Sequence, residues 1–178
     1  MAELIVVTGP PGAGKTTVSA DLATLFDRSA LIPGDEFFTF LRNGAIPPWL
    51  VGSDQQSTAV VAAAAAAAGR LAFYCDVVYD GVVAPAFRAT FLEHTGLAHM
   101  HYAVLMPTLD LCLDRVQNRK GHGFTDRDAT MGMWNHFHQA DIEISSLFED
   151  SDMPPSELAR LIARHVVSGS IRYPPAAS

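Results

Sequence analysis

One glycine-rich segment near the amino end, VVTGPPGAGKTTVSADL at residues 6–22, constrains the fold of this chain more than any other feature. It fills the pattern G-x-x-x-x-G-K-S/T with Gly9, Gly14, Lys15 and Thr16. Glycines leave backbone N–H groups free to surround a polyphosphate, and the lysine and the start of the next helix add positive charge. The segment therefore predicts a phosphate-binding loop between a strand and a helix.

The residues on either side of this loop have the patterns that such a loop requires. The run ELIVVT at residues 3–8 is typical of a buried parallel strand. Apolar residues recur at helical spacing behind the loop, at Val18, Leu22, Leu25 and Phe26. Further strand-like runs alternate with helical segments: ALIP, LAFYCDVVY, MHYAVLM and, more weakly, ISSLFE. This alternation predicts an α/β fold with a parallel sheet covered on both faces.

Composition limits the number of domains and the class of partner. The chain has 178 residues, 49% of them hydrophobic, which suffices for one core, so we expect residues 1–178 to form a single domain. A formal net charge of −7 argues against a nucleic-acid surface, which needs clustered Lys and Arg. We expect a small-molecule partner and no nucleic acid.

Cysteine placement and hydropathy bear on the compartment. Cys75 falls in a predicted strand and Cys112 on the apolar stripe of a predicted helix, where reduced, buried thiols are expected. The longest apolar run, Ala59–Ala68, is too short to cross a bilayer, and the first residues lack the basic region of a signal peptide. The sequence thus favours a soluble, cytoplasmic protein that does not bind membranes.

Asp35 follows the second predicted strand, in the segment LIPGDEFF. Ligands of doubly wound sheets bind beyond the carboxyl ends of the strands, so this carboxylate is placed to orient a substrate hydroxyl and take its proton during phosphoryl transfer. In the structural alternative, Asp35 or Glu36 caps a helix formed by EFFTFLRN.

Asp80 ends another hydrophobic strand, where a carboxylate is well placed to hold Mg²⁺ through water. Asp76 is a competing candidate, but its depth in the strand would require an internal partner for its charge. Arg88 lies eight residues past Asp80 and could reach an anionic substrate or pair with a surface carboxylate. The sequence favours neither role for Arg88.

A cationic segment, RVQNRKGHGFTDRD, lies between two predicted helices, and the second of these has Thr125 and Asp128 as its expected caps. Its cations lie around two glycines: Arg115, Arg119, Lys120 and Arg127. Such a group in an acidic protein indicates a lid over residues 115–139 that meets charge on a transferred phosphoryl group. An exposed basic loop is the alternative.

Aromatic residues follow Asp35 in a segment that we expect to form an acceptor-side flap over residues 35–52. They are Phe37, Phe38, Phe40 and Trp49. These rings could line an acceptor pocket or pack in the flap, and we expect at least one to face the ligand.

Two patterns predict helix starts elsewhere in the chain. Ser53 and Gln56 form an S-x-x-Q capping box before an alanine-rich helix that extends to Gly69. Pro154 or Pro155 can occupy the first turn of another helix.

The histidines do not indicate a metal site. His99 and His101 could share a face at a strand start, but no carboxylate or cysteine joins them in the sequence, so we expect no zinc.

The chain resembles the small P-loop kinases related to shikimate kinase, gluconate kinase, adenylate kinase and chloramphenicol phosphotransferase. The resemblance spans nearly the whole chain and rests on GPPGAGKTT as phosphate loop, GD at 34–35, YDG at 79–81, RxxxRKGH at 115–122 as lid, and SDMPPSELARLI as the adenine-side segment. It implies a P-loop NTPase fold with a five-stranded parallel sheet in the order 2-3-1-4-5, helices on both faces and a small lid.

The resemblance also implies a kinase that uses ATP and Mg²⁺ to phosphorylate a hydroxyl of a small molecule, antibiotic-like or sugar-acid-like. Asp35 would act as base, Lys15 would hold phosphates, and Thr16 with Asp80 would hold Mg²⁺. The lid arginines Arg119 and Arg127 would neutralise charge in the transition state. The expected nucleotide-binding residues are Gly9, Pro10, Gly12, Ala13, Gly14, Lys15, Thr16, Thr17, Arg115 and Pro155. The expected acceptor-binding residues are Asp35, Phe38, Arg42, Trp49, Asp80 and Arg88.

Two other functions stay open at this point. A nucleoside or nucleoside monophosphate kinase would need a base-specific pocket and, for a monophosphate, paired arginines among Arg42, Arg70 and Arg88. An ATPase or switch protein would instead act on a protein partner. The sequence allows a monomer or a homodimer.

Overall fold

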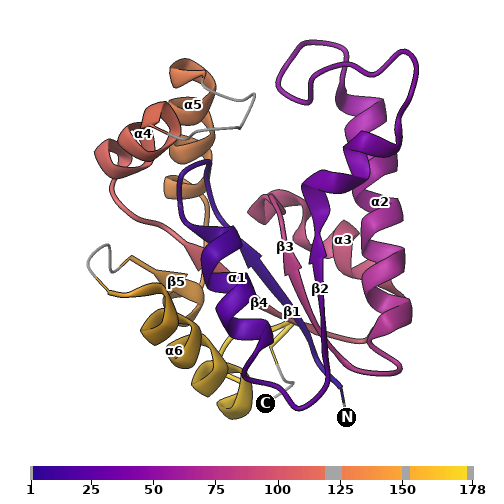
Figure 1. Ribbon diagram of the computed structural model, residues 1–178, viewed down its shortest axis with the longest axis vertical. Coiled ribbons are helices and arrows are strands. Elements are labelled where there is room, and N and C mark those ends of the chain that lie inside the picture. The colour runs from indigo at the N-terminus through magenta and orange to yellow at the C-terminus, as the bar shows by residue number, and fades with distance from the viewer. Residues whose placement is uncertain (1, 119–125, 150–152, 176–178) are drawn as a thin grey trace.

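The computed structural model describes residues 2–118, 126–149 and 153–175 of the chain. Five parallel strands lie at its centre in the order β2-β3-β1-β4-β5, and β6 pairs antiparallel with β4 (Figure 1). The strands are β1 Leu4–Thr8, β2 Ser29–Pro33, β3 Asp76–Asp80, β4 Met100–Leu105, β5 Leu147–Phe148 and β6 Arg172–Tyr173. The expected α/β fold and strand order are therefore confirmed.

Helices cover both faces of the sheet (Figure 1). The helices α1 (Lys15–Ala23) and α6 (Pro155–Ser168) pack on one face, while α2 (Asp54–Leu71) and α3 (Arg88–Thr95) pack on the other. Beyond the carboxyl end of β4, α4 (Leu109–Asn118) and α5 (Arg127–His138) pack on each other. The short 3-10 helices are η1 Gly34–Phe40, η2 Pro85–Phe87 and η3 Ile144–Ser146. Among the described helices, none has the length and apolar character that a membrane span requires.

The central strand β1 divides the core because successive side chains of a strand point to opposite faces. Ile5 and Val7 pack with residues of α1 and α6, whereas Leu4 and Val6 pack with residues of α2 and α3. All four side chains are buried. Burial of both strand faces explains why the run reads as continuously hydrophobic rather than alternating.

The alanine-rich helix α2 lies close to its neighbours because its buried side is made of small residues. Ala64, Ala65 and Ala68 have no exposed surface. A Cβ atom added at Gly69 would strike the Thr95 carbonyl oxygen of α3. The sequence pattern predicted this helix, but the close contact of α2 with α3 depends on the tertiary structure.

Three expected local features are wrong. The segment EFFTFLRN does not form an α-helix, since η1 ends at Phe40 and Leu41 is extended. Ser53 and Gln56 form no capping box, because the Ser53 hydroxyl donates to the Pro48 carbonyl oxygen (2.8 Å) and Gln56 bonds the backbone of Ile46. The side chains that would cap α2 bind the flap instead.

The third difference concerns α5, whose N-cap is Asp126 rather than Thr125 or Asp128. Its carboxylate accepts a hydrogen bond from the Ala129 amide (2.9 Å). Thr125 itself lies outside the described residues, as do Arg119 and Lys120 of the expected lid. The short strand β6 has no counterpart among the expected elements.

Candidate active site

The phosphate loop follows β1 and ends in the first turn of α1, as the motif predicted. Gly9 and Gly12 have φ values of 142° and 80°, which L side chains rarely adopt. A Cβ atom at Gly9 would also strike the Leu105 carbonyl oxygen, and one at Gly12 would strike that of Cys112. Glycine is required at both positions by backbone conformation and by the close approach of β4 and α4.

Lys15 and Arg115 bring positive charge to this loop. The Lys15 ammonium donates to the carbonyl oxygens of Gly9 and Pro10, both at 3.0 Å, so its side chain curls over the loop. Arg115 of α4 donates from Nη1 to the Gly12 carbonyl oxygen at 3.3 Å. Both cations therefore lie against the backbone of the loop and bring positive charge to this end of the sheet.

Asp80 and Asp35 lie at the same edge of the sheet as the loop. The strand β3 pairs with both neighbours, so that Asp80 lies opposite Val7 of β1 and Pro33 of β2. Asp35 follows two residues after Pro33. The carboxyl ends of three adjacent strands thus bring both carboxylates to the phosphate loop, as expected from the sequence.

Tyr79 lies close enough to both carboxylates for their charges to affect its hydroxyl group. Burial of its ring is the main cause that raises the pKa of Tyr79, and the negative charges of Asp35 and Asp80 raise it further. A Cβ atom added at Gly34 would strike the Tyr79 hydroxyl, so the glycine before Asp35 lets the chain pass close to this ring. Asp80 is buried, whereas Asp35 is exposed.

Asp76, the alternative to Asp80, begins β3 and so lies at the amino end of the parallel strands, away from the loop. One of its carboxylate oxygens accepts a hydrogen bond from the Glu3 amide at 2.8 Å. This contact supplies the internal partner that its position in the strand required.

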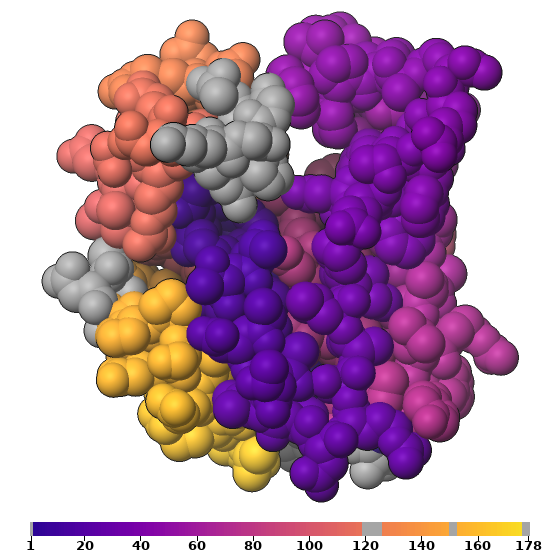
Figure 2. Space-filling view, in the orientation of Figure 1, coloured from indigo at the N-terminus to yellow at the C-terminus, as the bar shows by residue number. Residues whose placement is uncertain are grey.

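A cavity of about 1530 Å³ joins the loop to the acceptor side. Figure 2 shows the surface hollowed below the purple segment that precedes α2. The lining includes the loop, Asp35, Asp80, Arg115 and Pro155. Most expected nucleotide-binding positions and both carboxylates therefore face one continuous space.

We call the side of the cavity formed by the flap, α2, the segment after β3, η2 and α3 the acceptor wall. It contains two of the four aromatic residues of the flap. Phe38 and Trp49 line the cavity. Phe37 and Phe40 contact each other with ring centroids 5.2 Å apart, and Phe37 packs against the core. Either use of an aromatic ring was open from the sequence, and the structure divides the four rings between the two uses.

Neither of the two arginines expected near the acceptor, Arg42 and Arg88, lines the cavity, and the expected lid residue Arg127 does not line it either. Arg88 donates to a Glu143 carboxylate oxygen (2.9 Å), and its guanidinium lies over the Tyr173 ring. Arg42 is exposed on the flap, and Arg127 is exposed in the first turn of α5. Among the described residues, Arg115 is the arginine that lines the cavity.

Several residues that line the cavity were not predicted from the sequence, because they come from helices that carry no motif. These lining residues lie on α2, η2 and α3: Ser57, Thr58, Val61, Phe87, Thr90, Phe91 and His94. The polar pair Ser57–Thr58, which directly precedes the apolar run of α2, was a signal that could have identified two of them.

Thr8 fixes the segment after β3 that forms one wall of the cavity. Its hydroxyl accepts from the Val83 amide (2.9 Å) and donates to the Val83 carbonyl oxygen (3.2 Å). The Tyr102 hydroxyl donates to the same carbonyl oxygen at 2.6 Å. These buried bonds hold Val83 against the ends of β1 and β4, where it lines the cavity.

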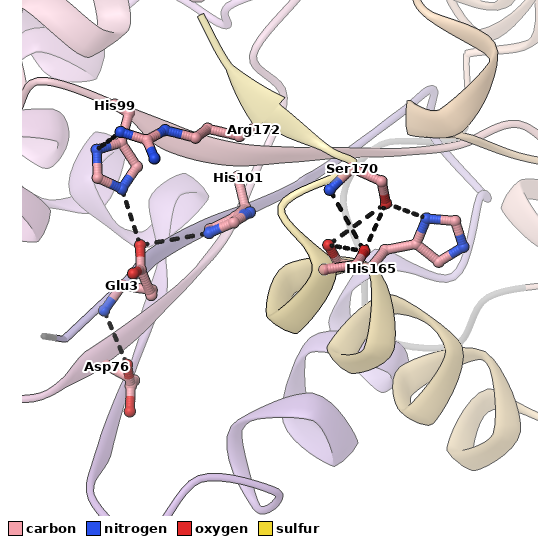
Figure 3. Close-up of polar contacts among 8 residues, drawn as sticks. Glu3, Asp76, His99, His101, His165, Ser170 and Arg172 are labelled. Atoms are coloured by element: carbon pink, nitrogen blue, oxygen red, sulfur yellow. Dashed lines mark hydrogen bonds and ion pairs between the residues drawn. The ribbon is translucent and has the colours of Figure 1, made fainter. Parts of the chain in front are cut away.

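The opposite edge of the sheet holds a separate polar cluster (Figure 3). Glu3 lies 3.0 Å from His99 Nε2 and 3.3 Å from His101 Nε2. The expectation that no carboxylate joins these histidines is therefore wrong, because β1 brings Glu3 beside β4. An Arg172 Nη2 donor lies 3.1 Å from His99 Nδ1. Since a guanidinium only donates, the proton of His99 belongs on the nitrogen that faces Glu3, as in a hydrogen-bonded cluster.

Comparison with known proteins establishes the fold. No family model matches the chain, and no curated protein matches its sequence. Similar solved structures include a tunicamycin resistance protein from Deinococcus radiodurans (19% identity over 93% of this chain and 96% of that chain, TM-score 0.70). A sugar kinase from Janibacter sp. HTCC2649 is 20% identical over 100% of this chain and 99% of that chain, with TM-score 0.67. A gluconokinase from Sinorhizobium meliloti 1021 is 20% identical over 95% of each chain, with TM-score 0.65. The resemblance to the small P-loop kinases is thereby confirmed for the fold.

Proposed function

We propose that this protein is a kinase that transfers the γ-phosphoryl group of ATP to a hydroxyl of a small molecule. The observation that carries the proposal is that Asp35, Asp80 and the phosphate loop face one cavity of about 1530 Å³. The cavity continues past the carboxylates to an apolar wall, so it has room for an acceptor beside the nucleotide. Similarity to a sugar kinase and a gluconokinase agrees with this chemistry.

Asp35 is the proposed base. It would orient the acceptor hydroxyl and take its proton as the oxygen forms a bond to the γ-phosphorus and the bond to the bridging oxygen of ADP breaks. The proton then passes to solvent. Its place beside the phosphate loop and its exposure to the cavity support this role.

The loop and its neighbours would hold the nucleotide. Lys15 and the loop amides would hold the β- and γ-phosphates, and Arg115 with Pro155 would flank the adenine ring of the nucleotide. The hydroxyl of Thr16 and the carboxylate of Asp80 fit a Mg²⁺ ion, because hard oxygen donors line the cavity next to the loop. When bound, Mg²⁺ would offset the negative charge of the phosphates. Arg119 and Arg127 remain the proposed lid cations.

A nucleoside monophosphate kinase is less well supported. It would need arginines that grip the acceptor phosphate, but Arg88 pairs with Glu143 and Arg70 lies over the Phe73 ring. Neither of these arginines lines the cavity. An ATPase that acts on a protein partner would leave the apolar acceptor wall without a role.

The deciding experiment measures ADP release with Mg²⁺-ATP across hydroxylated sugars, sugar acids, nucleosides and amino alcohols, with mass spectrometry of the product. We expect one acceptor class to raise turnover far above background. Asp35→Asn should lower this turnover by about 10²–10⁴-fold while nucleotide binding is retained. Asp27→Asn, the same change at an exposed position outside the cavity, is the matched control. Transfer that survives in Asp35→Asn would show that the proposed base is wrong.

A further inference from the structure

Among the side chains that line the cavity, the described lysine and arginine lie at one end only, the end that also holds Asp80 and the Asp114 carboxylate of α4. The cations Lys15 and Arg115 lie at the phosphate loop. Three carboxylates, those of Asp35, Glu36 and Asp54, belong to the acceptor end, where η1 meets the start of α2. All three of these residues are exposed, so their charges face the open cavity rather than the core.

No described lysine or arginine that lines the cavity lies at this end, where His94 of α3 is also part of the lining and Arg42 is exposed on the flap. The three carboxylates take no part in the ion pairs of Arg88, His99 and His101. Asp54 lies in the first turn of α2, where the helix dipole offsets part of its charge. Glu36 lies in the short η1 and its carboxylate takes no hydrogen bond from a described residue.

The remainder of the acceptor end is apolar and rich in aromatic rings. Apolar side chains of this wall come from the flap, α2, the segment after β3, η2 and α3: Phe38, Trp49, Val61, Val82, Phe87 and Phe91. Such a wall favours a largely apolar ligand, because binding removes apolar surface from water. Its aromatic rings also attract a cation through their negative faces. Rings and carboxylates together match one kind of group, a protonated amine on an apolar skeleton.

We propose that the acceptor is a hydroxyl compound that carries a protonated amine on a largely apolar body. This inference rests on the proposed kinase function and names its substrate class. A carboxylate or phosphate on the acceptor would meet three negative side chains and the γ-phosphate in the same space, and no described lysine or arginine lines this end of the cavity to offset the repulsion. The sugar acids expected from the sequence resemblance are thereby disfavoured.

Three probes with one skeleton test this inference: 2-amino-1-phenylethanol, 1-phenylethane-1,2-diol and mandelate. Each carries a benzylic hydroxyl, and the three differ in carrying a cation, no charge or an anion. With Mg²⁺-ATP we expect the amine to show a KM about tenfold or more below that of mandelate, with the diol between them. Added salt should narrow the gap because it screens exposed charges. A KM for mandelate equal to or below that of the amine would overturn the inference.

Glu36→Gln assigns the effect to a residue. It should raise the KM for the amine about threefold to tenfold and lower that for mandelate, with the diol unchanged. Glu93→Gln makes the same change on an exposed part of α3 that does not line the cavity and should change none of the three values. Equal effects of Glu36→Gln on all three probes would indicate a structural role and contradict the inference.

Calorimetric binding of the same probes without ATP separates this inference from the kinase proposal. Tighter binding of the amine without phosphorylation of any probe would support the charge preference and contradict the kinase. Phosphorylation of mandelate as readily as of the amine would support the kinase and contradict the charge preference. Binding of none of the three probes would contradict the charge preference as well.

Discussion

The two walls of the cavity are built in different ways. The phosphate wall is a short loop held by close backbone contacts, with Gly9 against Leu105 and Gly12 against Cys112. The acceptor wall includes Pro48 and Trp49 of the flap, and residues 41–50 of this flap are all exposed. This flap is tied to α2 by side-chain bonds, chiefly from Gln56 to the Ile46 amide (2.8 Å) and carbonyl (2.6 Å).

The difference shows which half of the site can vary. A loop whose glycines are fixed by neighbouring backbone cannot accept other side chains without a shift of β4 or α4. An exposed flap held by the side chains of Ser53 and Gln56 can change its other residues at little cost to the fold. This explains why the nucleotide half carries a recognisable motif while the acceptor half does not.

The largest effect should follow from removing the charge of the phosphate wall. Lys15→Ala should lower ADP formation by about 10³-fold or more and weaken nucleotide binding, because the ammonium that meets the phosphates is lost. Steady-state kinetics and a titration with a fluorescent ATP analogue measure the two effects. Unchanged thermal unfolding would show that the fold survives. Retention of more than a tenth of the activity would contradict the assigned role of Lys15.

Gly69→Ala tests how firmly α2 is docked on α3, both of which carry acceptor-wall residues. We expect a loss of about 2–3 kcal/mol in the free energy of unfolding, because the new methyl group meets the Thr95 carbonyl oxygen. Denaturant unfolding measures it. Gly132→Ala is the matched control in α5, where a Cβ atom meets nothing within 4 Å. That variant should gain about 0.5–1 kcal/mol from helix propensity. A gain in both would refute the close docking of α2 on α3.

Gln56→Ala tests the attachment of the flap and should affect only the acceptor half. We expect the KM for the acceptor to rise about threefold to tenfold while the KM for ATP stays the same, because two hydrogen bonds that hold the flap are lost. Gln55→Ala, one residue earlier and exposed, is the control. An equal rise in the KM for ATP would mean that the two walls are not independent.

The smallest expected effect is a pH dependence of the free energy of unfolding, which arises from His101 in the polar cluster at the amino end of the parallel strands. Burial lowers the pKa of His101 and outweighs the opposing effect of Glu3, with His99 and Arg172 lowering it further. The unfolded chain therefore binds this proton more tightly, and stability should fall as pH drops below the unfolded value of about 6.5, by at most about 1.4 kcal/mol per pH unit.

His101→Gln should flatten this slope between pH 7.5 and 5.5, as measured by urea unfolding at each pH. His136→Gln, at an exposed position on α5, should leave the slope unchanged. A slope that persists in His101→Gln would assign the pH dependence to other groups.

Local patterns predicted much of the fold and the loop between β1 and α1. The strand order followed from the resemblance carried by the motifs, and Asp35 and Asp80 follow from the rule that ligands bind at the carboxyl ends of parallel strands. The errors occurred where a local signal competed with a distant partner. Ser53 and Gln56 have the residue types of a capping box, but Pro48 and Ile46 satisfy them. Glu3 joins His99 and His101 only because β1 and β4 are neighbours.

The sequence by itself determined the phosphate loop, since each requirement of that loop lies within a few consecutive residues and is met by glycine, lysine and threonine. Only the tertiary structure decided which side chains face the acceptor. Arg88 pairs with Glu143 and leaves the cavity, while Glu36 and Asp54 enter its lining from separate elements. The net charge of the acceptor end depends on residues from several elements that lie together only in the folded chain, so no short segment of the sequence predicts it.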